Sequence, residues 1–451
     1  MTITQDIYHI PAGSVEIIVS PLRGIRAAVN AAGASALRNA LLRNTPLPDS
    51  LGGLAAFLSE PSAAPAIPTG AARPPFMGLI LTRGCNMRCR YCDFNADQHG
   101  DDMDEELISR ALGGWAEWVS DGNGDSLNLQ FFGGEPFTRF DLVEIAVHRL
   151  RFLGRKYGLP THVEACTNGL LGEAALGFVR DYFDAIILSL DGLAEDHDPH
   201  RALRDGSGTF GGVWATAQAL AQSTVELCVR CCVSSLNVER MPLIAEWLCR
   251  DLRPDSIVFE AMKPTPIASA AWLAQPDPLQ FVRGFMAAYR AARQAGVECI
   301  YAAVSERPRH TLCPVGRDTF IVAPDRSVRS CYLRRSDWQA AGLDMRIGRV
   351  NEDGNLLIET EAVQRLREAV AGRARCRRCF CRWSCAGGCI VTETPPGHGA
   401  AYTDYCRQTR LIEACVMLER LGMGDRAGVL PDDEQAVIRL WEHADDRLTE
   451  E

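Results

Sequence analysis

Short apolar runs alternate with longer amphipathic segments through the middle of the chain, which is typical of βα units with parallel strands. The strand-like runs are Met77–Thr82, Leu127–Phe132, Thr161–Thr167, Ala185–Leu190, Val225–Val233 and Ser256–Glu260. The helical segments are Glu105–Ser120, Leu142–Lys156, Ala174–Tyr182, Gly212–Gln222, Met241–Leu252 and Pro278–Ala295. The pattern predicts an α/β fold whose parallel sheet is open or closed into a partial barrel.

The first residues have a different pattern from this middle region. Residues 1–60 predict a small N-terminal module, with a strand at Val15–Val19 and helical patterns at Ile25–Leu42 and Leu54–Leu58. Residues 61–75, rich in Pro, Ala and Gly, predict a linker.

Three further units are expected after the linker. The α/β core spans residues 76–303, and a cysteine-rich region of short segments and turns spans residues 304–410. Residues 411–451 predict a helical, acidic tail.

Composition and charge exclude several classes of protein. Of the 451 residues, 47% are hydrophobic, which is typical of a globular protein. The formal charge of −10 argues against binding nucleic acid or an anionic membrane through bulk charge. No apolar run approaches the roughly 20 residues of a membrane helix, and no secretory signal is visible. The sequence therefore predicts a cytoplasmic protein with no nucleic-acid or membrane partner.

Cysteine is unusually frequent, with 18 in the chain. In a reducing compartment, clustered cysteines hold metal more often than they form disulfides. Three lie between positions 85 and 92, six between 166 and 299, and eight between 313 and 406, and Cys415 follows alone. The first and third groups are the candidates for metal binding.

The first group follows the first predicted strand as C-x3-C-x2-C, at Cys85, Cys89 and Cys92. Three thiolates on one loop can hold three irons of a [4Fe–4S] cluster and leave the fourth iron open to an outside ligand. The alternatives are a structural zinc site or three core cysteines. Zinc favours two C-x2-C pairs, and no second pair lies in this stretch.

Tyr91 precedes the third cysteine, so the segment reads C-x3-C-x-aromatic-C and resembles the signature of the radical S-adenosylmethionine (radical SAM) enzymes. The resemblance implies a partial (β/α)6 TIM-like barrel, with SAM bound to the open iron. It also implies that the reduced cluster cleaves SAM to a 5′-deoxyadenosyl radical, which abstracts hydrogen from the substrate. A flavodoxin or ferredoxin is the usual reductant in this family.

A Gly-Gly-Glu sequence ends the second predicted strand, at Gly133, Gly134 and Glu135. Glycines allow the backbone to approach a ligand closely, and a carboxylate can accept hydrogen bonds from an ammonium group. The sequence resembles the family motif that holds the amino group of SAM.

Polar residues also follow the third and fourth strands. Asn168 comes after the third, and Ser189 and Asp191 come after the fourth. The resemblance implies that these positions contact the ribose and the methionyl carboxylate, with Arg201 as a further partner of that carboxylate. Each alone is consistent with an ordinary turn. Polar motifs at the ends of consecutive strands are what a site in an α/β barrel requires.

The middle group of cysteines is expected to be structural. Those within predicted strands or helices are expected to be small core residues: Cys166, Cys228, Cys231, Cys232 and Cys249. Arg230 and Asn237 flank the fifth strand and are candidates to line the site.

The third group of cysteines resembles the SPASM extension of radical SAM enzymes that act on peptides and proteins. Its centre reads C-x2-C-x5-C-x3-C. The resemblance implies two auxiliary [4Fe–4S] clusters, and three in total. The distal cluster, auxiliary cluster II, is assigned to Cys376, Cys379, Cys385 and Cys406. The one nearer the active site, auxiliary cluster I, is assigned to Cys313, Cys331 and Cys389.

Two departures from the SPASM pattern stand out. The family often has Gly five residues before the second cysteine, where this chain has Arg326. Auxiliary cluster I lacks the usual fourth ligand, so either Cys299 supplies it or the site is open. Cys381 has no assigned role, and one or two zinc ribbons are the alternative for this region.

The resemblance implies an oxidoreductase that installs a cross-link or related oxidation on a ribosomally made precursor peptide. An alternative is an anaerobic sulfatase-maturating enzyme, which forms formylglycine. Those enzymes place an Asp base directly after the second auxiliary cysteine, where this chain has Tyr332. Tyrosine, with a pKa near 10, is a poor base at neutral pH, which favours peptide maturation.

A non-catalytic iron–sulfur or zinc protein that binds a partner is the alternative of another class. It accounts for the C-terminal cysteines but not for the polar motifs at the strand ends. The N-terminal module is either a leader-peptide site, through addition of a strand to a sheet edge, or a scaffold that caps the barrel.

Overall fold

The computed structural model describes residues 6–43, 45–54, 63–66, 69–70, 74–92, 94, 101–122, 124–263, 266–313, 319–371, 376–393 and 402–442. Most of the helical pattern expected at Leu54–Leu58 lies outside the described residues. No helix in the described part of the chain combines the length and apolar character needed to cross a lipid bilayer.

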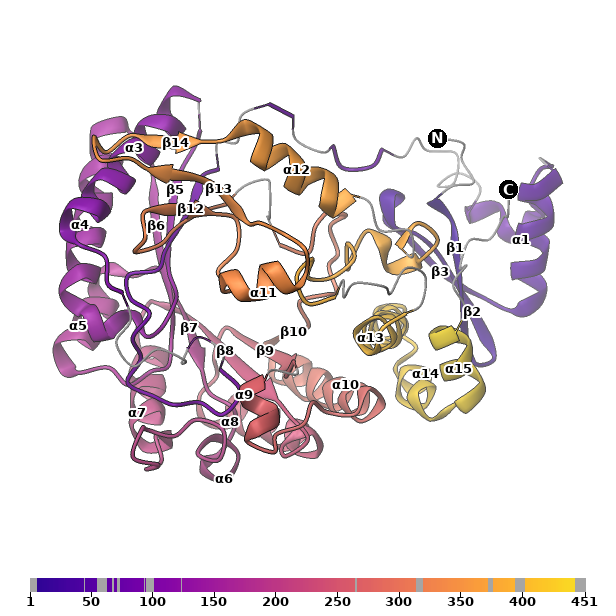
Figure 1. Cartoon of the computed structure of the whole chain (residues 1–451). Helices are drawn as coiled ribbons and strands as arrows, with labels where there is room; N and C mark the ends of the chain where they lie inside the picture. Colours follow the sequence, from indigo (N-terminus) through magenta and orange to yellow (C-terminus); the bar gives the residue numbers. More distant parts are fainter. Residues whose placement is uncertain are drawn as a thin grey trace.

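An eleven-stranded sheet forms the centre of the molecule and curves as an open ring (Figure 1). Its order is β10-β9-β8-β7-β6-β5-β4-β11-β12-β13-β14. The parallel strands are β4 (Phe76–Leu79), β5 (Leu127–Phe131), β6 (Thr161–Thr167), β7 (Ala185–Ser189), β8 (Glu226–Val233), β9 (Ser256–Ala261) and β10 (Glu298–Ile300). The predicted α/β fold with a partial barrel is confirmed.

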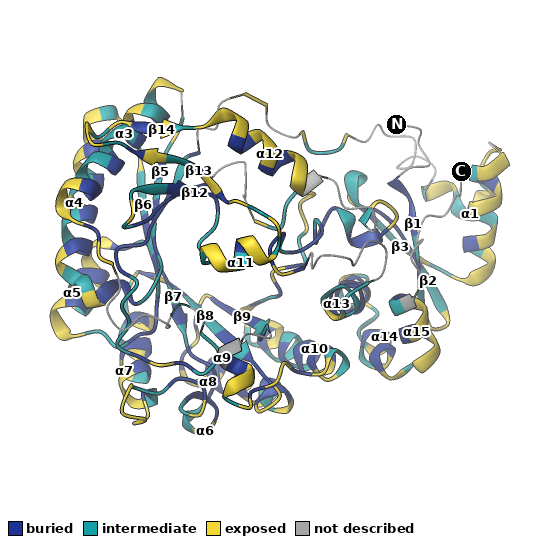
Figure 2. Ribbon diagram, in the orientation of Figure 1, coloured by how far each residue is buried: buried dark blue, intermediate teal, exposed yellow. Residues whose placement is uncertain are grey.

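Helices cover the outer side of these strands. They are α3 (Glu105–Asp121), α4 (Phe140–Tyr157), α5 (Glu173–Tyr182), α7 (Phe210–Ala221), α8 (Met241–Asp251) and α10 (Pro278–Ala295). Two short helices, α6 (Ala194–His197) and α9 (Pro266–Ala270), lie in the connections after β7 and β9. Figure 2 shows the buried residues of α4 and α5 on the side that faces the sheet. Asp104 and Asp277 cap α3 and α10 by accepting hydrogen bonds from first-turn N–H groups, which sets where these helices begin.

The cysteine-rich region extends the same sheet beyond β4. β11 (Phe320–Val322) pairs in parallel with β4, and β12 (Ser327–Arg329), β13 (Arg346–Val350) and β14 (Leu356–Ile358) follow antiparallel. The helices of this region are α11 (Arg335–Ala340) and α12 (Thr360–Ala371). Arg326, in the turn between β11 and β12, has φ of 63°, the left-handed conformation that explains why a glycine suits this position.

A separate three-stranded antiparallel sheet begins the described chain. It consists of β1 (Tyr8–Ala12), β2 (Val15–Ser20) and β3 (Ile25–Val29), followed by α1 (Ala31–Arg43). The expected helix over Ile25–Leu42 is therefore wrong for its first five residues. They form β3 because all five pair with residues 16–20 of β2, and such tertiary pairing overrides a weak local helical pattern.

The C-terminal helices pack against this small sheet (Figure 1). They are α13 (Asp404–Arg420), α14 (Gly424–Val429) and α15 (Glu434–Glu442). α13 is buried along most of its length, and α15 contacts β1. Arg426 donates a hydrogen bond to the Ser14 hydroxyl, so the two ends of the described chain are joined directly.

Candidate active site

The cysteine loop after β4 is held against the Gly-Gly-Glu motif after β5. The Gly134 N–H donates to the Thr82 carbonyl at 3.0 Å, and the Glu135 N–H donates to the Gly84 carbonyl at 2.8 Å. The Gly84 N–H in turn donates to the Thr82 hydroxyl at 2.9 Å. The two segments therefore form one backbone unit at the carboxyl edge of the sheet.

Both glycines of the motif are required by this close approach. A Cβ atom on Gly134 would lie 1.9 Å from the Gly84 carbonyl oxygen, and one on Gly133 would lie 2.8 Å from Ile80 Cγ2. Gly133 also has φ of 136°, a conformation that favours glycine.

The loop brings Cys85, Cys89 and Cys92 together. Cys89 is buried, and Cys85 and Cys92 are partly exposed. Burial raises the pKa of both Cys85 and Cys89 to about 11, so these thiols stay protonated at neutral pH until a metal displaces the proton. Three such thiols on one loop fit a [4Fe–4S] cluster that keeps one iron open.

Glu135 connects the motif to the end of β6. Its buried carboxylate accepts hydrogen bonds from the Thr167 hydroxyl at 2.8 Å, the Asn168 N–H at 2.7 Å and the Phe137 N–H at 3.1 Å. Burial raises its pKa to about 6. A carboxylate has about four acceptor positions, so one remains for a ligand ammonium group.

Asn168 extends this connection to the cysteine loop. Its side-chain amide donates to Asn86 Oδ1 at 2.7 Å and lies 3.8 Å from Cys85 Sγ. Asn86 was not predicted as a site residue from the sequence. Its position between two of the cysteines, as a polar residue in an otherwise apolar and basic loop, is the signal that could have identified it.

Asp191 after β7 is fully buried, and its carboxylate is engaged by protein groups. It accepts from the Tyr91 hydroxyl at 2.6 Å and from the Cys232 N–H at 3.0 Å, and it lies 3.6 Å from Arg201 Nε. Asp191 therefore orients the side chains of Tyr91, within the cysteine loop, and of Arg201, beside it. Ser189 is half-buried at the end of β7, in register with Arg230.

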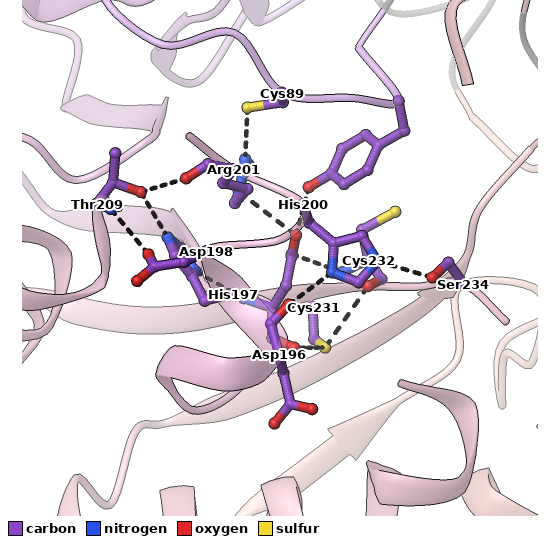
Figure 3. A network of polar contacts seen from close by, with 12 residues as sticks. Cys89, Asp196, His197, Asp198, His200, Arg201, Thr209, Cys231, Cys232 and Ser234 are labelled. Carbon is purple, nitrogen blue, oxygen red and sulfur yellow. Dashed lines mark hydrogen bonds and ion pairs between the residues drawn. The ribbon is translucent and has the colours of Figure 1, made fainter. Parts of the chain in front are cut away.

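Arg201 joins this group to the cysteine loop, as Figure 3 shows. Its Nη1 donates to Cys89 Sγ at 3.7 Å, and its guanidinium carbon lies 5.6 Å from the centre of the Tyr91 ring. The arginine is therefore close enough to Cys89 to contact a ligand bound at the cysteine loop.

Two buried histidines, His197 and His200, lie in the same network as Arg201 (Figure 3). The Asp191 N–H donates to His197 Nδ1 at 3.3 Å, so the proton of His197 lies on Nε2, which donates to Thr209 Oγ1 at 3.0 Å. His200 lies between a main-chain carbonyl of α6 and the Ser234 hydroxyl. Burial lowers the pKa of His197 to about 4, so it is neutral at pH 7. The clustered histidines before Arg201 were a signal that sequence analysis did not use.

The expectation that the middle cysteines are core residues is only partly correct. Cys231 and Cys249 are buried, but the other three are only partly buried: Cys166, Cys228 and Cys232. β8 alternates its side chains, so its partly buried positions share a side with Arg230, which pairs with Glu260. Asn237 is buried and donates to the Asp191 carbonyl at 3.1 Å, so it supports the site.

The cysteines expected for auxiliary cluster I lie near one another. Cys331, after β12, has Cys313 and Cys389 as neighbours, and burial raises its pKa to about 12. Cys299 does not join them. It lies in β10 beside Cys249, so it is not placed to supply the fourth ligand.

The cysteines expected for auxiliary cluster II line one pocket, which we call the distal pocket. Its lining includes Cys376, Cys379, Cys381, Cys385, Cys406 and Arg410. The set of thiols suits a [4Fe–4S] cluster, and Cys381 is a fifth thiol beyond the four that such a cluster needs.

Tyr332 reaches from the cysteine-rich region across β4. Its ring lies 4.5 Å from that of Phe132, and its hydroxyl lies 2.0 Å from where a Gly78 Cβ would be. The hydroxyl is buried, and it neither donates nor accepts a hydrogen bond among the described residues. Burial raises its pKa well above the ordinary value, so Tyr332 is no base at neutral pH.

Comparison with known proteins finds a family that matches part of this chain. A model of the radical SAM superfamily matches residues 79–248. A cysteine-type anaerobic sulfatase-maturating enzyme from Clostridium perfringens (strain 13 / Type A) is 30% identical over 179 residues, covering 36% of this chain and 45% of that enzyme. The chain thus matches less than half the length of this relative.

Two solved structures share the fold. Native anSMEcpe with bound AdoMet and Cp18Cys peptide has a TM-score of 0.63 and 18% identity, covering 78% of this chain and 99% of that one. Streptococcus suis SuiB bound to precursor peptide SuiA has a TM-score of 0.50 and 13% identity, covering 86% and 95%.

The family match spans the strands and loops that carry the cysteine loop and the strand-end motifs. It supports SAM and one [4Fe–4S] cluster as the cofactors of this region. Residues 79–248 are therefore a radical SAM domain.

Proposed function

We propose that this chain is a radical SAM enzyme with two auxiliary [4Fe–4S] clusters, which modifies a precursor peptide by hydrogen abstraction. The observation that carries the proposal is that the C-terminal cysteines gather into two separate groups outside the radical SAM domain. Cysteines that lie near one another in two places fit two further clusters better than scattered core cysteines do.

Within the radical SAM domain, bound SAM and the cluster supply the radical chemistry. Cys85, Cys89 and Cys92 hold the cluster. Glu135 has acceptor capacity for the SAM ammonium group, and Arg201 is placed to meet its carboxylate. Tyr91 and Asp191 hold this arginine in position.

The SAM-contact set proposed from sequence also includes Tyr91, Gly133, Gly134, Asn168, Ser189 and Asp191. A flavodoxin or ferredoxin is the proposed reductant.

A peptide substrate is supported by what the structural neighbours bind. Both anSMEcpe and SuiB are described with bound peptides, and both share this fold. The N-terminal sheet of this chain ends in β3, whose outer edge is unpaired among the described residues and is available to a leader segment.

Formylglycine formation is the second candidate, because a sulfatase-maturating enzyme is among the curated relatives. Tyr332 argues against it. The residue directly after Cys331 carries no carboxylate, and its hydroxyl is buried with a raised pKa. Peptide maturation of another kind therefore remains the first proposal.

The test is an anaerobic reaction of the reconstituted enzyme with SAM, dithionite and a short peptide encoded beside its gene. We expect 5′-deoxyadenosine and a peptide that has lost hydrogen, both absent with Cys89→Ala. A sulfatase-derived cysteine peptide is expected to yield no formylglycine. If wild-type enzyme forms no 5′-deoxyadenosine with any reductant, the chain is a binding protein and the proposal fails.

A further inference from the structure

Arg410 is a buried arginine on the wall of the distal pocket. It is 1% exposed and lies on α13, four residues after Cys406. Residues four apart lie on one face of a helix, so α13 presents a cysteine and a positive charge to the same pocket.

Several contacts fix the guanidinium group in place. Nη1 donates to Cys379 Sγ at 3.2 Å and to the Tyr402 hydroxyl at 3.1 Å, and Nε donates to the Leu440 carbonyl at 2.5 Å. Its carbon lies 4.7 Å from the centre of the Phe380 ring and 4.5 Å from that of Tyr402. The charge therefore points at a cysteine sulfur in a dry, rigid setting.

A [4Fe–4S] cluster with four thiolate ligands is negatively charged, and one-electron reduction adds a further negative charge. An N–H group that donates to a ligating sulfur, and a nearby positive charge, both favour the more negative state. The effect is strong where solvent does not screen it. Because Arg410 offers both, its contact with Cys379 acts on the reduction potential and not only on packing.

We propose that Arg410 is a positioning residue for a cluster in the distal pocket and that it raises the reduction potential of that cluster. The oxidised cluster takes one electron from the external reductant to give the reduced cluster, and no covalent bond forms or breaks. The proposal rests on the proposed function, since it needs a cluster in this pocket.

The test is a potentiometric titration of the reconstituted full chain, followed by electron paramagnetic resonance, with iron measured on each sample. Arg410→Gln removes the charge, and Arg410→Lys retains it. Arg420→Gln removes the same charge at the far end of α13 and is the matched control. For Arg410→Gln we expect one couple to become harder to reduce, by at least a tenfold change in its oxidised-to-reduced ratio, or about 59 mV. Arg410→Lys should shift less, and Arg420→Gln should not shift.

Loss of about four irons in Arg410→Gln, with retention in Arg410→Lys, would also support the proposal, because the charge would then be needed to hold the cluster. Unchanged potentials in Arg410→Gln, or equal iron loss in both Arg410 variants, would overturn it. If the wild-type chain holds only about four irons, the proposed function is overturned as well. If it holds about twelve, only the proposed role of Arg410 fails.

Discussion

At the scale of single residues, the candidate site depends on positions where the neighbouring backbone leaves no room for a larger side chain. Gly134 is the clearest case, because the atom that a Cβ would meet is a carbonyl oxygen of the cysteine loop and not a flexible side chain. We predict that Gly134→Ala displaces the loop, loses about four irons from the reconstituted protein and abolishes SAM cleavage. Gly177→Ala is the control, because a Cβ there on α5 meets nothing within 4 Å. Full iron and activity in Gly134→Ala would contradict the account.

His197 makes the same region sensitive to acid. Its pKa is about 4 in the folded state, against 6.5 when exposed. Between these two pKa values, His197 binds the proton only when this region is locally unfolded. The free energy of local unfolding therefore decreases as pH falls, by about 1 kcal/mol at pH 5.5. Amide hydrogen exchange over residues 191–201, corrected for intrinsic rates, should show this loss between pH 7.5 and 5.5. His197→Gln should remove the dependence, and the exposed His148→Gln should retain it; equal behaviour of the two variants would refute the assignment.

At the scale of elements, the sequence was most informative where periodicity was strong. The strands and the long helices from β4 to α10 are found where the apolar pattern predicts them, with ends that differ by a few residues, whereas the short helices α6 and α9 were not predicted. The prediction failed at Ile25–Val29, because the pairing partner of a short strand is not visible in local periodicity. The positions of the cysteine loop and the Gly-Gly-Glu motif were predictable because each follows a strand directly.

The unpaired edge of β3 leads to a prediction at this scale. If a leader peptide adds a strand there, saturating precursor should slow hydrogen exchange in Ile25–Val29 and leave the central strand β6 unchanged. Bound precursor without any protection of β3 would show that the N-terminal sheet is a scaffold. The intact chain is needed, because this sheet packs against α15 and a truncation would expose the core.

At the scale of the whole molecule, contacts between distant segments were not predictable from the sequence. The cysteines of the distal pocket could be identified from their spacing in the sequence. No local pattern shows that Arg410 joins them or that Tyr332 enters the barrel over Gly78. The sheet that continues from β4 into β11 explains the contact of Tyr332, since it places the cysteine-rich region beside the radical SAM domain.

The central claim is that one chain holds three iron–sulfur clusters. The most direct test is the amount of iron and acid-labile sulfide per chain after anaerobic purification and reconstitution. Three [4Fe–4S] clusters require about twelve of each. A value near four, with zinc in the remaining cysteine sites, would leave a radical SAM domain beside a structural zinc region and would contradict the proposed function.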